Sequence, residues 1–364
     1  MQGNRIQRLA QMISDAGVDA YFARTPVAMG YLHGFPEDGH ERFLTLAVRA
    51  NGDVCMICPA LSANQAQRAG IKDVRAWRDG EQPLSLFAGL AQDWGLKSGV
   101  LAVDNDLPAH MLLGMQEVLP AALFKPGGAF LGEMMSRKES GEIDALRAAG
   151  KIADEAFDEV YPQLRAGMTE REVARMLFGA MAARGGNPTF AIVATGANGA
   201  EPHHETDDTK LATGDVVILD FGCEWKGYLS DITRVVAIGD PGDKAREVYR
   251  IVHASHWAGR TAAQPGVPCE MVDQAARDVI EAAGYGPQFP HRTGHGIGLL
   301  GHEEPYIVSG NQTPLAAGHC FSIEPGIYLP GEFGVRIENI IAMQSEGPES
   351  MNVDPSPELL EVHP

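Results

Sequence analysis

An internal repeat in the C-terminal part of the sequence is the feature that most constrains its fold. Residues 167–190 align with residues 266–289, 99 positions further on, and both copies carry the same glycine, proline and aromatic landmarks. The positions that coincide are Gly167/Gly266, Val173/Val272, Ala183/Ala282, Gly185/Gly284, Pro188/Pro287 and Phe190/Phe289. Each copy has the pattern of a helix followed by a turn that contains glycine. A duplicated unit of this kind predicts a domain with approximate twofold symmetry.

The repeat continues into strand-like segments, and acidic residues fall at matching places in both copies. GDVVILDFG at 214–222 aligns with GHCFSIEPG at 318–326, so Asp220 corresponds to Glu324. One strand further on, Asp231 in YLSDITRVVAI corresponds to Glu338 in VRIENIIAM. Because the symmetry axis relates the copies, we expect these four carboxylates to converge on a curved, mostly antiparallel sheet with helices outside it.

Four carboxylates in apolar strands need positive charge nearby. Burying a lone carboxylate is costly, and carboxylates that approach one another raise each other's pKa unless cations neutralise them. Four unrelated acids in surface ion pairs are the alternative, which the symmetry of the set disfavours. Histidines gather here as well: His291, His295 and His302 lie in one run, and His203 and His204 in another. Oxygen ligands with a single imidazole favour Mn²⁺ and tolerate Co²⁺, Zn²⁺ or Fe²⁺, and four carboxylates balance two such ions.

Composition argues against several other classes of protein. The chain has 364 residues, with 29 Lys+Arg and 48 Asp+Glu, and a formal net charge of −19. Such acidity disfavours a nucleic-acid binder and a protein of anionic membrane surfaces. We expect a cytoplasmic protein, because the sequence shows neither a signal peptide nor a run approaching the ~18 apolar residues of a membrane span. Its five cysteines fit reduced thiols, and Cys55 and Cys58 form a C-x-x-C inside a strand-like run.

The sequence does not support three common motifs of other enzyme classes. GHGIGLLG contains G-x-G-x-x-G, but no strand precedes it, and Pro305 blocks a helix interior after it. HEEPY is not H-E-x-x-H, because Tyr306 stands where the second histidine would be. No G-x-S-x-G nucleophile elbow occurs in the chain. These failures disfavour dinucleotide binding, a zincin site and a serine hydrolase.

Ahead of the repeat, the chain alternates short helical and strand-like patterns. Residues 4–16 have helical spacing, residues 18–22 and 100–104 predict strands, and Asn51-Gly52 between two strand-like runs predicts a hairpin. A long amphipathic helix over 142–161 follows, with Ile143, Leu146, Ile152 and Phe157 on one side. We therefore expect a small α/β domain over residues 1–131 and the duplicated domain over residues 132–364.

The motifs PH, LDFG, YLSDITR, HRTGHGIG, HEEP, SIEPG and VRIEN together resemble those of the dinuclear metallopeptidases with the pita-bread fold. Prolidase, aminopeptidase P and methionine aminopeptidase belong to this family, with creatinase as a relative that lacks the metals. The resemblance covers nearly the whole chain, because YLHGF at 31–35 is similar to the creatinase/prolidase N-terminal domain. It implies an α/β (α+β) protein with a pseudo-twofold pita-bread catalytic domain over 132–364 and a creatinase/prolidase-like domain over 1–131.

The resemblance also implies the metal ligands, which are Asp220, Asp231, His295, Glu324 and Glu338. The spacing of eleven positions between the two aspartates is that of the family, and its SD-x-TR motif stands intact as Ser230, Asp231, Thr233 and Arg234. Two divalent ions, with Mn²⁺ favoured and Co²⁺ or Zn²⁺ possible, would hold a hydroxide between them. Glu324 would move the proton from this nucleophile to the leaving nitrogen.

The remaining site residues are also implied by the resemblance. His203 from the PH motif and His302 from HEEP match the two catalytic histidines that contact the substrate and the tetrahedral intermediate. His291 and Arg336 match residues that line the substrate site, and Arg336 shares a strand face with Glu338. His204, directly after the PH motif, is interpreted as a bystander.

The function implied is hydrolysis of the peptide bond before proline in a small peptide, most simply by an Xaa-Pro dipeptidase (prolidase). An Xaa-Pro aminopeptidase acting on longer peptides shares the same ligands and stays open. A metal-free binding module of the same fold is disfavoured because all five ligands are present. The family implies a homodimer, and the polar loop 33–42, with Glu37, Asp38 and Arg42, is a candidate for limiting substrate length across it.

Overall fold

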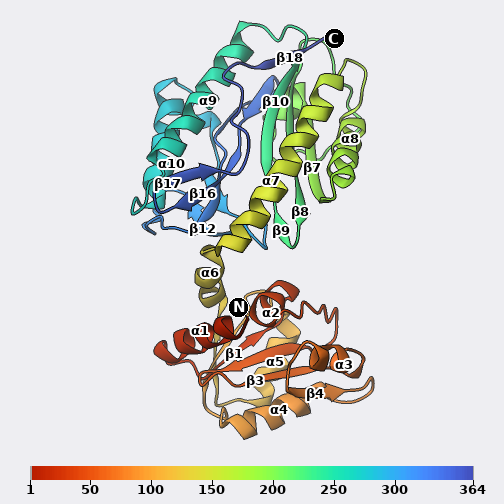
Figure 1. Cartoon of the computed structure of the whole chain (residues 1–364), viewed down its shortest axis with the longest axis vertical. Helices are drawn as coiled ribbons and strands as arrows, with labels where there is room; N and C mark the ends of the chain where they lie inside the picture. The colour runs from red at the N-terminus through yellow and green to blue at the C-terminus, as the bar shows by residue number, and fades with distance from the viewer. Residues whose placement is uncertain (1, 364) are drawn as a thin grey trace. The chain divides into compact units, whose positions relative to one another are not determined.

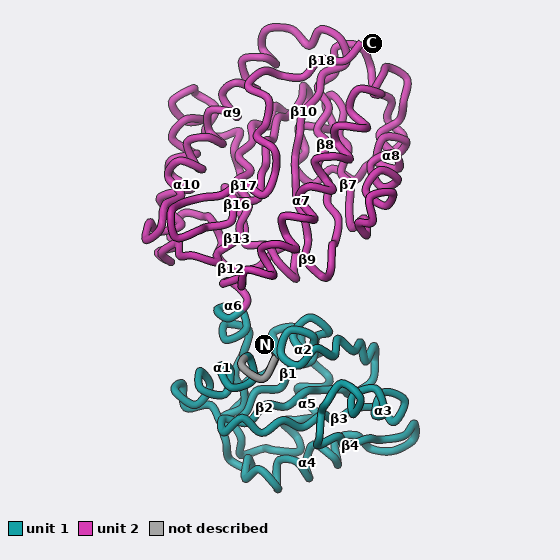
Figure 2. Tube along the Cα trace, in the orientation of Figure 1, with its two compact units in different colours: residues 1–134 teal, residues 135–364 magenta. Residues whose placement is uncertain are grey.

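The computed structural model describes residues 2–363 (Figure 1). The chain forms two compact units, residues 1–134 and 135–364 (Figure 2). The division falls three positions after the boundary that the sequence suggests. Each unit buries its own set of apolar side chains, so each has the core of an independent domain.

The first unit is a six-stranded sheet flanked by helices. Its strands are β1 (Ala20–Ala23), β2 (Thr45–Arg49), β3 (Val54–Pro59), β4 (Asp73–Trp77), β5 (Val100–Val103) and β6 (Leu123–Pro126), in the order β4-β3-β2-β1-β5-β6. Its helices are α1 (Gln2–Asp15), α2 (Pro26–His33), α3 (Ala60–Arg68), α4 (Pro83–Trp94) and α5 (Ala109–Val118), and α6 (Gly128–Ser136) continues into the second unit. The sheet is mixed, because β2 pairs antiparallel with its neighbours whereas β5 runs parallel to β1.

The hairpin predicted at Asn51-Gly52 is confirmed. Strands β2 and β3 pair antiparallel across it, and Gly52 has φ 90°, which favours glycine. Cys55 and Cys58 both lie in β3 and are fully buried, as the interpretation of C-x-x-C as strand residues requires. Burial raises the pKa of these thiols to about 12 and about 11, so both are poor nucleophiles.

The second unit places helices outside strands (Figure 1). Its helices are α7 (Ser140–Val160), α8 (Glu170–Ala183), α9 (Asp243–Ala262) and α10 (Cys269–Ala282), with short 3₁₀ turns η1 (Tyr161–Gln163), η2 (Gly196–Ala200) and η3 (Gly286–Gln288). The predicted apolar side of α7 is buried, and Thr169 and Glu172 form a capping box at the start of α8. Helices α8 and α10 fall in the two copies of the repeat, as the alignment predicts.

Two mostly antiparallel sheets make up the interior of this unit. The first contains β7 (Asn187–Thr195), β8 (Val216–Trp225), β9 (Tyr228–Leu229), β10 (Ile232–Ile238) and β18 (Leu360–Val362), in the order β18-β10-β8-β7 with β9 beside β8. The second contains β11 (Gly294–Gly296), β12 (Glu303–Ile307), β13 (Cys320–Ile323), β16 (Asn339–Gln344) and β17 (Gly347–Ser350), in the order β12-β11-β13-β16-β17. Strands β14 (Gly326–Leu329) and β15 (Phe333–Arg336) pair with each other as a separate two-stranded hairpin. The pseudo-twofold α/β architecture is thus confirmed, with the antiparallel strands divided between two sheets.

An isolated bridge between Thr233 of β10 and Glu338, the residue before β16, connects the two sheets. A short strand, β11, does precede the glycine-rich run, contrary to the expectation from the sequence. The run leads into β12 and not into a helix, so it still lacks the context of a dinucleotide site. Glycine is needed at Gly294, since a Cβ there would collide with the backbone carbonyl of Ser322.

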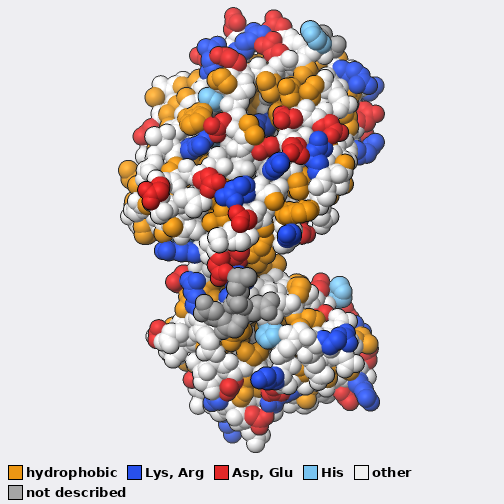
Figure 3. Space-filling model, viewed as in Figure 1, with side chains coloured by type: hydrophobic (Ala, Val, Ile, Leu, Met, Phe, Trp, Pro, Cys, Tyr) orange, Lys and Arg blue, Asp and Glu red, His pale blue; other side chains and the backbone are white. Residues whose placement is uncertain are grey.

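None of the helices in residues 2–363 combines the length and apolar character that crossing a bilayer requires. On the face shown in Figure 3, acidic and basic side chains are intermixed over both units.

Candidate metal centre and substrate pocket

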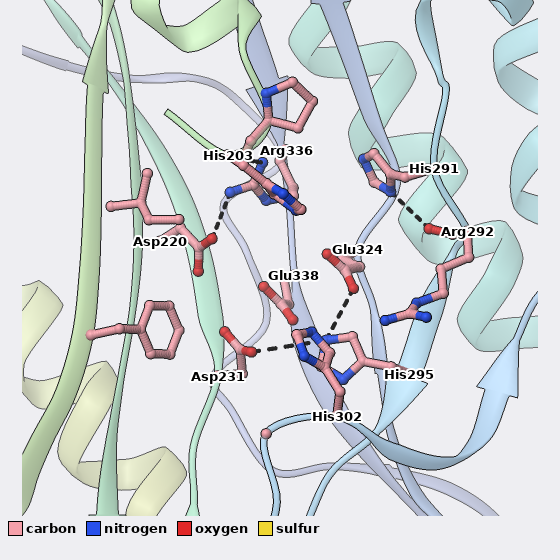
Figure 4. A pocket seen from close by; sticks show the side chains of 14 residues that line it. His203, Asp220, Asp231, His291, Arg292, His295, His302, Glu324, Arg336 and Glu338 are labelled. Atoms are coloured by element: carbon pink, nitrogen blue, oxygen red, sulfur yellow. Dashed lines mark hydrogen bonds and ion pairs between the residues drawn. The ribbon is translucent and has the colours of Figure 1, made fainter. Parts of the chain in front are cut away.

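A cavity of about 600 Å³ lies where the two sheets of the second unit meet. It is lined by all nine site residues that the sequence analysis singled out: His203, Asp220, Asp231, His291, His295, His302, Glu324, Arg336 and Glu338. Figure 4 shows the four carboxylates turned toward one another, with the histidines around them. The remaining lining residues are Phe190, Ile192, Pro202, Arg292 and Gly301.

Strand pairing explains why the acids converge. Asp220 lies within β8 opposite Thr233 of β10, and Asp231 comes immediately before β10. In the second sheet, Glu324 follows the last residue of β13 and Glu338 precedes the first residue of β16. Each sheet therefore brings its two acids to one end of an antiparallel pair, and the bridge between the sheets joins these ends.

Each carboxylate is held through one oxygen. Glu338 accepts a hydrogen bond from the Thr233 hydroxyl at 2.7 Å, and Asp220 accepts one from Arg336 Nη2 at 2.6 Å. His295 Nε2 lies 3.2 Å from Glu324 Oε1 and 3.9 Å from Asp231 Oδ2. These contacts fix the acids without using all of their acceptor capacity.

The second carboxylate oxygen of three of these acids has no such contact. Asp220 Oδ1, Asp231 Oδ1 and Glu338 Oε1 are buried and have no hydrogen-bond partner among the described residues. Burial, followed by the charges of neighbouring carboxylates, holds the pKa of Asp231 and of Glu338 well above the ordinary value. Burial also raises the pKa of Asp220, against the opposing charge of Arg336. Burial alone would raise the pKa of Glu324, but the hydrogen bond and the charge of His295 outweigh it and lower this pKa to about 2.

This donor set fits divalent cations. Ligand atoms of Asp231, His295 and Glu338 all lie within 4.8 Å of one another, close enough to share an ion. Buried oxygens without partners are costly, and cations are what would satisfy them and cancel the repulsion among the acids. The combination of carboxylates with one imidazole suits Mn²⁺ and neighbouring transition metals.

Two predicted lining residues are engaged by the protein itself. Arg336 is 4% exposed, and beyond Asp220 it donates to the Tyr328 hydroxyl at 2.9 Å and to Thr233 Oγ1 at 3.2 Å. His291 Nε2 lies 2.9 Å from the same Tyr328 hydroxyl, and its Nδ1 lies 2.8 Å from the Arg292 carbonyl. Both side chains line the cavity as expected, but their polar atoms mainly support the site.

The two other histidines, His203 and His302, also line the cavity. The His302 ring lies against that of His295, with centroids 4.0 Å apart and an interplanar angle of 70°. Burial, then the charge of His295, lowers the pKa of His302 to about 4, so it is neutral near pH 7. His203 follows η2 and lines the cavity, whereas His204 contacts Glu170 instead, with Nε2 2.7 Å from Oε2.

Sequence analysis missed Arg292 and the apolar wall of the cavity. Arg292 lies between His291 and His295 in a run that had been singled out, and its guanidinium sits 4.6 Å from the centre of the Tyr306 ring. Phe190 and Ile192 are two positions apart on β7, so they share a face of the strand. That alternation, and the position of Arg292 among site histidines, were available signals.

Comparisons with known proteins agree with this geometry. The family model for the creatinase/prolidase N-terminal domain matches residues 5–134, and that of metallopeptidase family M24 matches residues 144–345. The chain is 38% identical over 361 residues to a probable dipeptidase PepE of Mycobacterium tuberculosis, covering 96% of this chain and 93% of that one.

Solved structures match over nearly the full length. A prolidase from Thermococcus sibiricus is 34% identical with a TM-score of 0.94, covering 100% of this chain and 99% of that one. An X-Pro aminopeptidase from Thermotoga maritima is 32% identical with a TM-score of 0.85, covering 98% of this chain and 99% of that one. The chain therefore belongs to metallopeptidase family M24 and carries the creatinase/prolidase N-terminal domain of that group.

Proposed function

We propose that this metallopeptidase is an Xaa-Pro dipeptidase, which hydrolyses the bond before the proline of a dipeptide. The observation that carries the proposal is the cavity in which three buried carboxylate oxygens lie beside Arg292. Within residues 2–363 these oxygens have no hydrogen-bond partner and Arg292 has no acidic partner. Prolidase and dipeptidase relatives match the chain over its length, which supports the same assignment.

Two divalent cations held by Asp220, Asp231, His295, Glu324 and Glu338 would supply Lewis acids that activate water and polarise the scissile carbonyl. Glu324 has its Oε1 held by His295 and, at 3.1 Å, by the Ser322 hydroxyl. We assign its carboxylate the role of taking a proton from the attacking water and passing it to the proline nitrogen. His302 donates a hydrogen bond to the carbonyl oxygen as negative charge develops there, and His203 holds the leaving-group side.

The apolar wall and Arg292 account for the choice of substrate. Phe190 and Ile192 offer a surface on which a proline ring packs without losing hydrogen bonds. Arg292 makes no ion pair with any carboxylate of residues 2–363, so its guanidinium is available to a substrate. A guanidinium pairs with a carboxylate through two parallel hydrogen bonds, and a dipeptide carries that carboxylate on the proline itself. A longer peptide carries an amide there, which favours the dipeptidase over the aminopeptidase.

Substrate length is tested with Mn²⁺-loaded enzyme, Xaa-Pro dipeptides, their C-terminal amides and Xaa-Pro-Yaa tripeptides. We expect kcat/KM to be highest for the dipeptides. Arg292→Met should lower it about 10- to 100-fold through KM for dipeptides, with little change for the amides, whereas Arg292→Lys should retain more. Equal rates on tripeptides, unaffected by Arg292→Met, would instead establish the aminopeptidase.

The catalytic assignment is tested by Glu324→Gln and Asp231→Asn. Both variants should lose turnover by at least about 10³-fold, with circular dichroism unchanged. Retained turnover in both variants, with metal still bound, would contradict the assignment.

We also propose Mn²⁺ as the native metal, catalysis by the domain over residues 132–364, and a cytoplasmic homodimer. All five cysteines are buried free thiols, which supports a reducing compartment. Metal analysis of the protein as purified and sedimentation of the full chain test these points. The loop over 33–42 remains our candidate for limiting substrate length, although Arg42 is paired with Asp79 at 3.3 Å within its own unit.

A further inference from the structure

The two histidines assigned to the substrate, His203 and His302, stand 99 positions apart, which is the offset of the internal repeat. His203 comes after β7 and His302 after β11, so they occupy comparable places in the two halves. Among residues 2–363, neither imidazole ring makes a hydrogen bond to another group of the protein. Apart from the contact of the His302 ring with that of His295, the direction of both rings then depends on the backbone, and hence on what holds the neighbouring residues.

In the first half, the residue after the site histidine is anchored to a buried carboxylate. His204 Nε2 lies 2.7 Å from Glu170 Oε2, and the Glu170 side chain is fully buried. Glu170 also accepts from Thr195 N at 2.8 Å, from Asn198 Nδ2 at 3.0 Å and from Asp207 N at 3.1 Å. One carboxylate at the start of α8 thus ties together the end of β7, η2 and the segment that carries His203.

Glu170, His204 and Asp207 also have donor atoms close enough to hold an ion. The pattern of bonds argues against that use. Both oxygens of Glu170 already accept two hydrogen bonds each, and Asp207 Oδ1 accepts one from Thr209 N at 2.7 Å. A saturated carboxylate of this kind is built to hold the chain.

In the second half, the residue after the site histidine is anchored in the same way. Glu303 forms an ion pair with Lys138, and their side chains are only 5% and 2% exposed. Glu303 Oε2 also accepts from Leu300 N at 3.3 Å, and Lys138 N donates to the Gly318 carbonyl at 2.8 Å. The pair therefore ties the loop carrying His302 to the connection that precedes α7.

We propose that His204–Glu170 and Glu303–Lys138 are positioning pairs, each anchoring the residue that follows one site histidine, which aim His203 and His302 into the pocket. The proposal rests on the proposed function, because it assigns a purpose to these histidines only if they contact substrate. It changes the interpretation of His204 from a bystander to a positioning residue. A buried ion pair adds little stability over an apolar substitute, so specificity of geometry is the expected reason for one.

Mutant cycles test the first pair in the Mn²⁺-loaded full chain. His204→Ala should lower kcat/KM on an Xaa-Pro dipeptide about 10-fold, since a shift of 1 Å in a substrate-positioning group costs up to about 100-fold. His204→Gln, whose amide N–H can replace Nε2, should restore most of the loss. In a His203→Ala background, His204→Ala should have almost no further effect, whereas in a His302→Ala background its effect should remain full.

The second pair is tested by the converse cycle. Lys138→Met/Glu303→Gln removes both charges together, which avoids leaving one ion buried and unpaired. The double substitution should lower kcat/KM about 10-fold in the wild-type and His203→Ala backgrounds, and have almost no effect in the His302→Ala background. Thermal unfolding, metal content and calorimetric binding of a non-hydrolysable Xaa-Pro analogue are measured for every variant.

These results distinguish a failure of the positioning proposal from a failure of the proposed function. If His203→Ala and His302→Ala lower kcat/KM but the anchor variants act equally in both backgrounds, the pairs are merely structural and the positioning proposal is overturned, while the function stands. The same holds if the anchor variants change nothing. If removing the histidines themselves changes nothing, their roles in the proposed function fall, and the positioning proposal falls with them.

Discussion

Asp231 shows how a single residue can favour function at the expense of the metal-free fold. Its carboxylate lies among Asp220, Glu324 and Glu338, and one of its oxygens is buried without a hydrogen-bond partner in the described part of the chain. Without cations, the charges repel each other and lack water, and both effects destabilise the folded state. With cations, the same charges become ligands. Asp231 therefore destabilises the metal-free protein and contributes as a ligand once metal is bound.

Asp231→Asn should have opposite effects on the metal-free and metal-loaded protein. The asparagine removes one negative charge, and its amide can donate to the neighbouring carboxylates. If this relieves about 1 kcal/mol of repulsion, the metal-free variant should unfold about 2–4 °C above metal-free wild type. Added Mn²⁺ should then stabilise wild type and leave the variant almost unchanged. Differential scanning calorimetry with and without metal measures both. A metal-free variant less stable than wild type would show that repulsion is not the dominant cost.

His256 on α9 predicts acid sensitivity outside the pocket. Its ring is fully buried, and neither nitrogen has a hydrogen-bond partner within the described chain. Burial, then the charges of Arg234 and Arg260, lowers its pKa to about 3. Between pH 6.5 and 3 the unfolded chain binds a proton that the folded chain does not, so folding stability falls as pH falls.

His256→Leu should remove this dependence. Between pH 7 and pH 5, wild type should lose about 2 kcal/mol more unfolding free energy than the variant, since each unit of pKa difference is worth about 1.4 kcal/mol. Urea unfolding at pH 7, 6 and 5 measures the difference, with both proteins stripped of metal so that metal release does not contribute. Parallel pH profiles would mean that His256 is protonated in the folded protein.

At the scale of elements, the joint between the two sheets supports the metal ligands. Thr233 of β10 bridges to Glu338, and its hydroxyl donates to Glu338 Oε2 and accepts from Arg336 Nε. Arg234 beside it donates to the carbonyls of Glu338, at 2.6 Å, and of Val353, at 2.7 Å. Thr233 and Arg234 of the SD-x-TR motif thus connect one half-domain to the other at Glu338, a proposed metal ligand.

Thr233→Val should weaken metal binding more than folding. The substitution keeps the shape of the side chain but removes the hydroxyl that orients Glu338, and loss of such a partner typically costs about 10- to 100-fold in metal affinity. Thr233→Ser keeps the hydroxyl and is the matched control. Competition for Mn²⁺ with a chelating dye measures affinity, and thermal unfolding without metal measures the fold. Equal affinity in the Val and Ser variants would mean that the hydroxyl is dispensable.

Local elements and the symmetric acids could be predicted because their signals are local or repeated. Asn51-Gly52 marks a turn by its own chemistry, Thr169 and Glu172 mark a helix start, and the repeat places the acids by symmetry. The pairing of Lys138 with Glu303 could not be predicted, because 165 residues separate them and neither has a local pattern. The division of the strands into two sheets depends likewise on contacts between distant segments.

For the whole molecule, the division into two units separates the expected effects of metal. The residues of the proposed metal centre all lie in the second unit, between positions 220 and 338, while the first unit has a core of its own. Of the net charge of −19, residues 1–134 carry −3 and residues 135–364 carry −16, and the four pocket acids are the ones that cations would neutralise. Stabilisation by metal should therefore act on the second unit alone.

Calorimetry of the full chain should show this stabilisation by metal as a shift of one of two unfolding transitions. A ligand that binds only the folded form stabilises it by about 2.7 kcal/mol at a hundred times its dissociation constant, which is about 5–10 °C for a unit of this size. Mn²⁺ should raise the unfolding temperature of the second unit and leave that of the first in place. The Asp231→Asn chain is the control, in which neither transition should move. A single transition that shifts as a whole would show that the two units unfold together, because metal bound to one would then stabilise both.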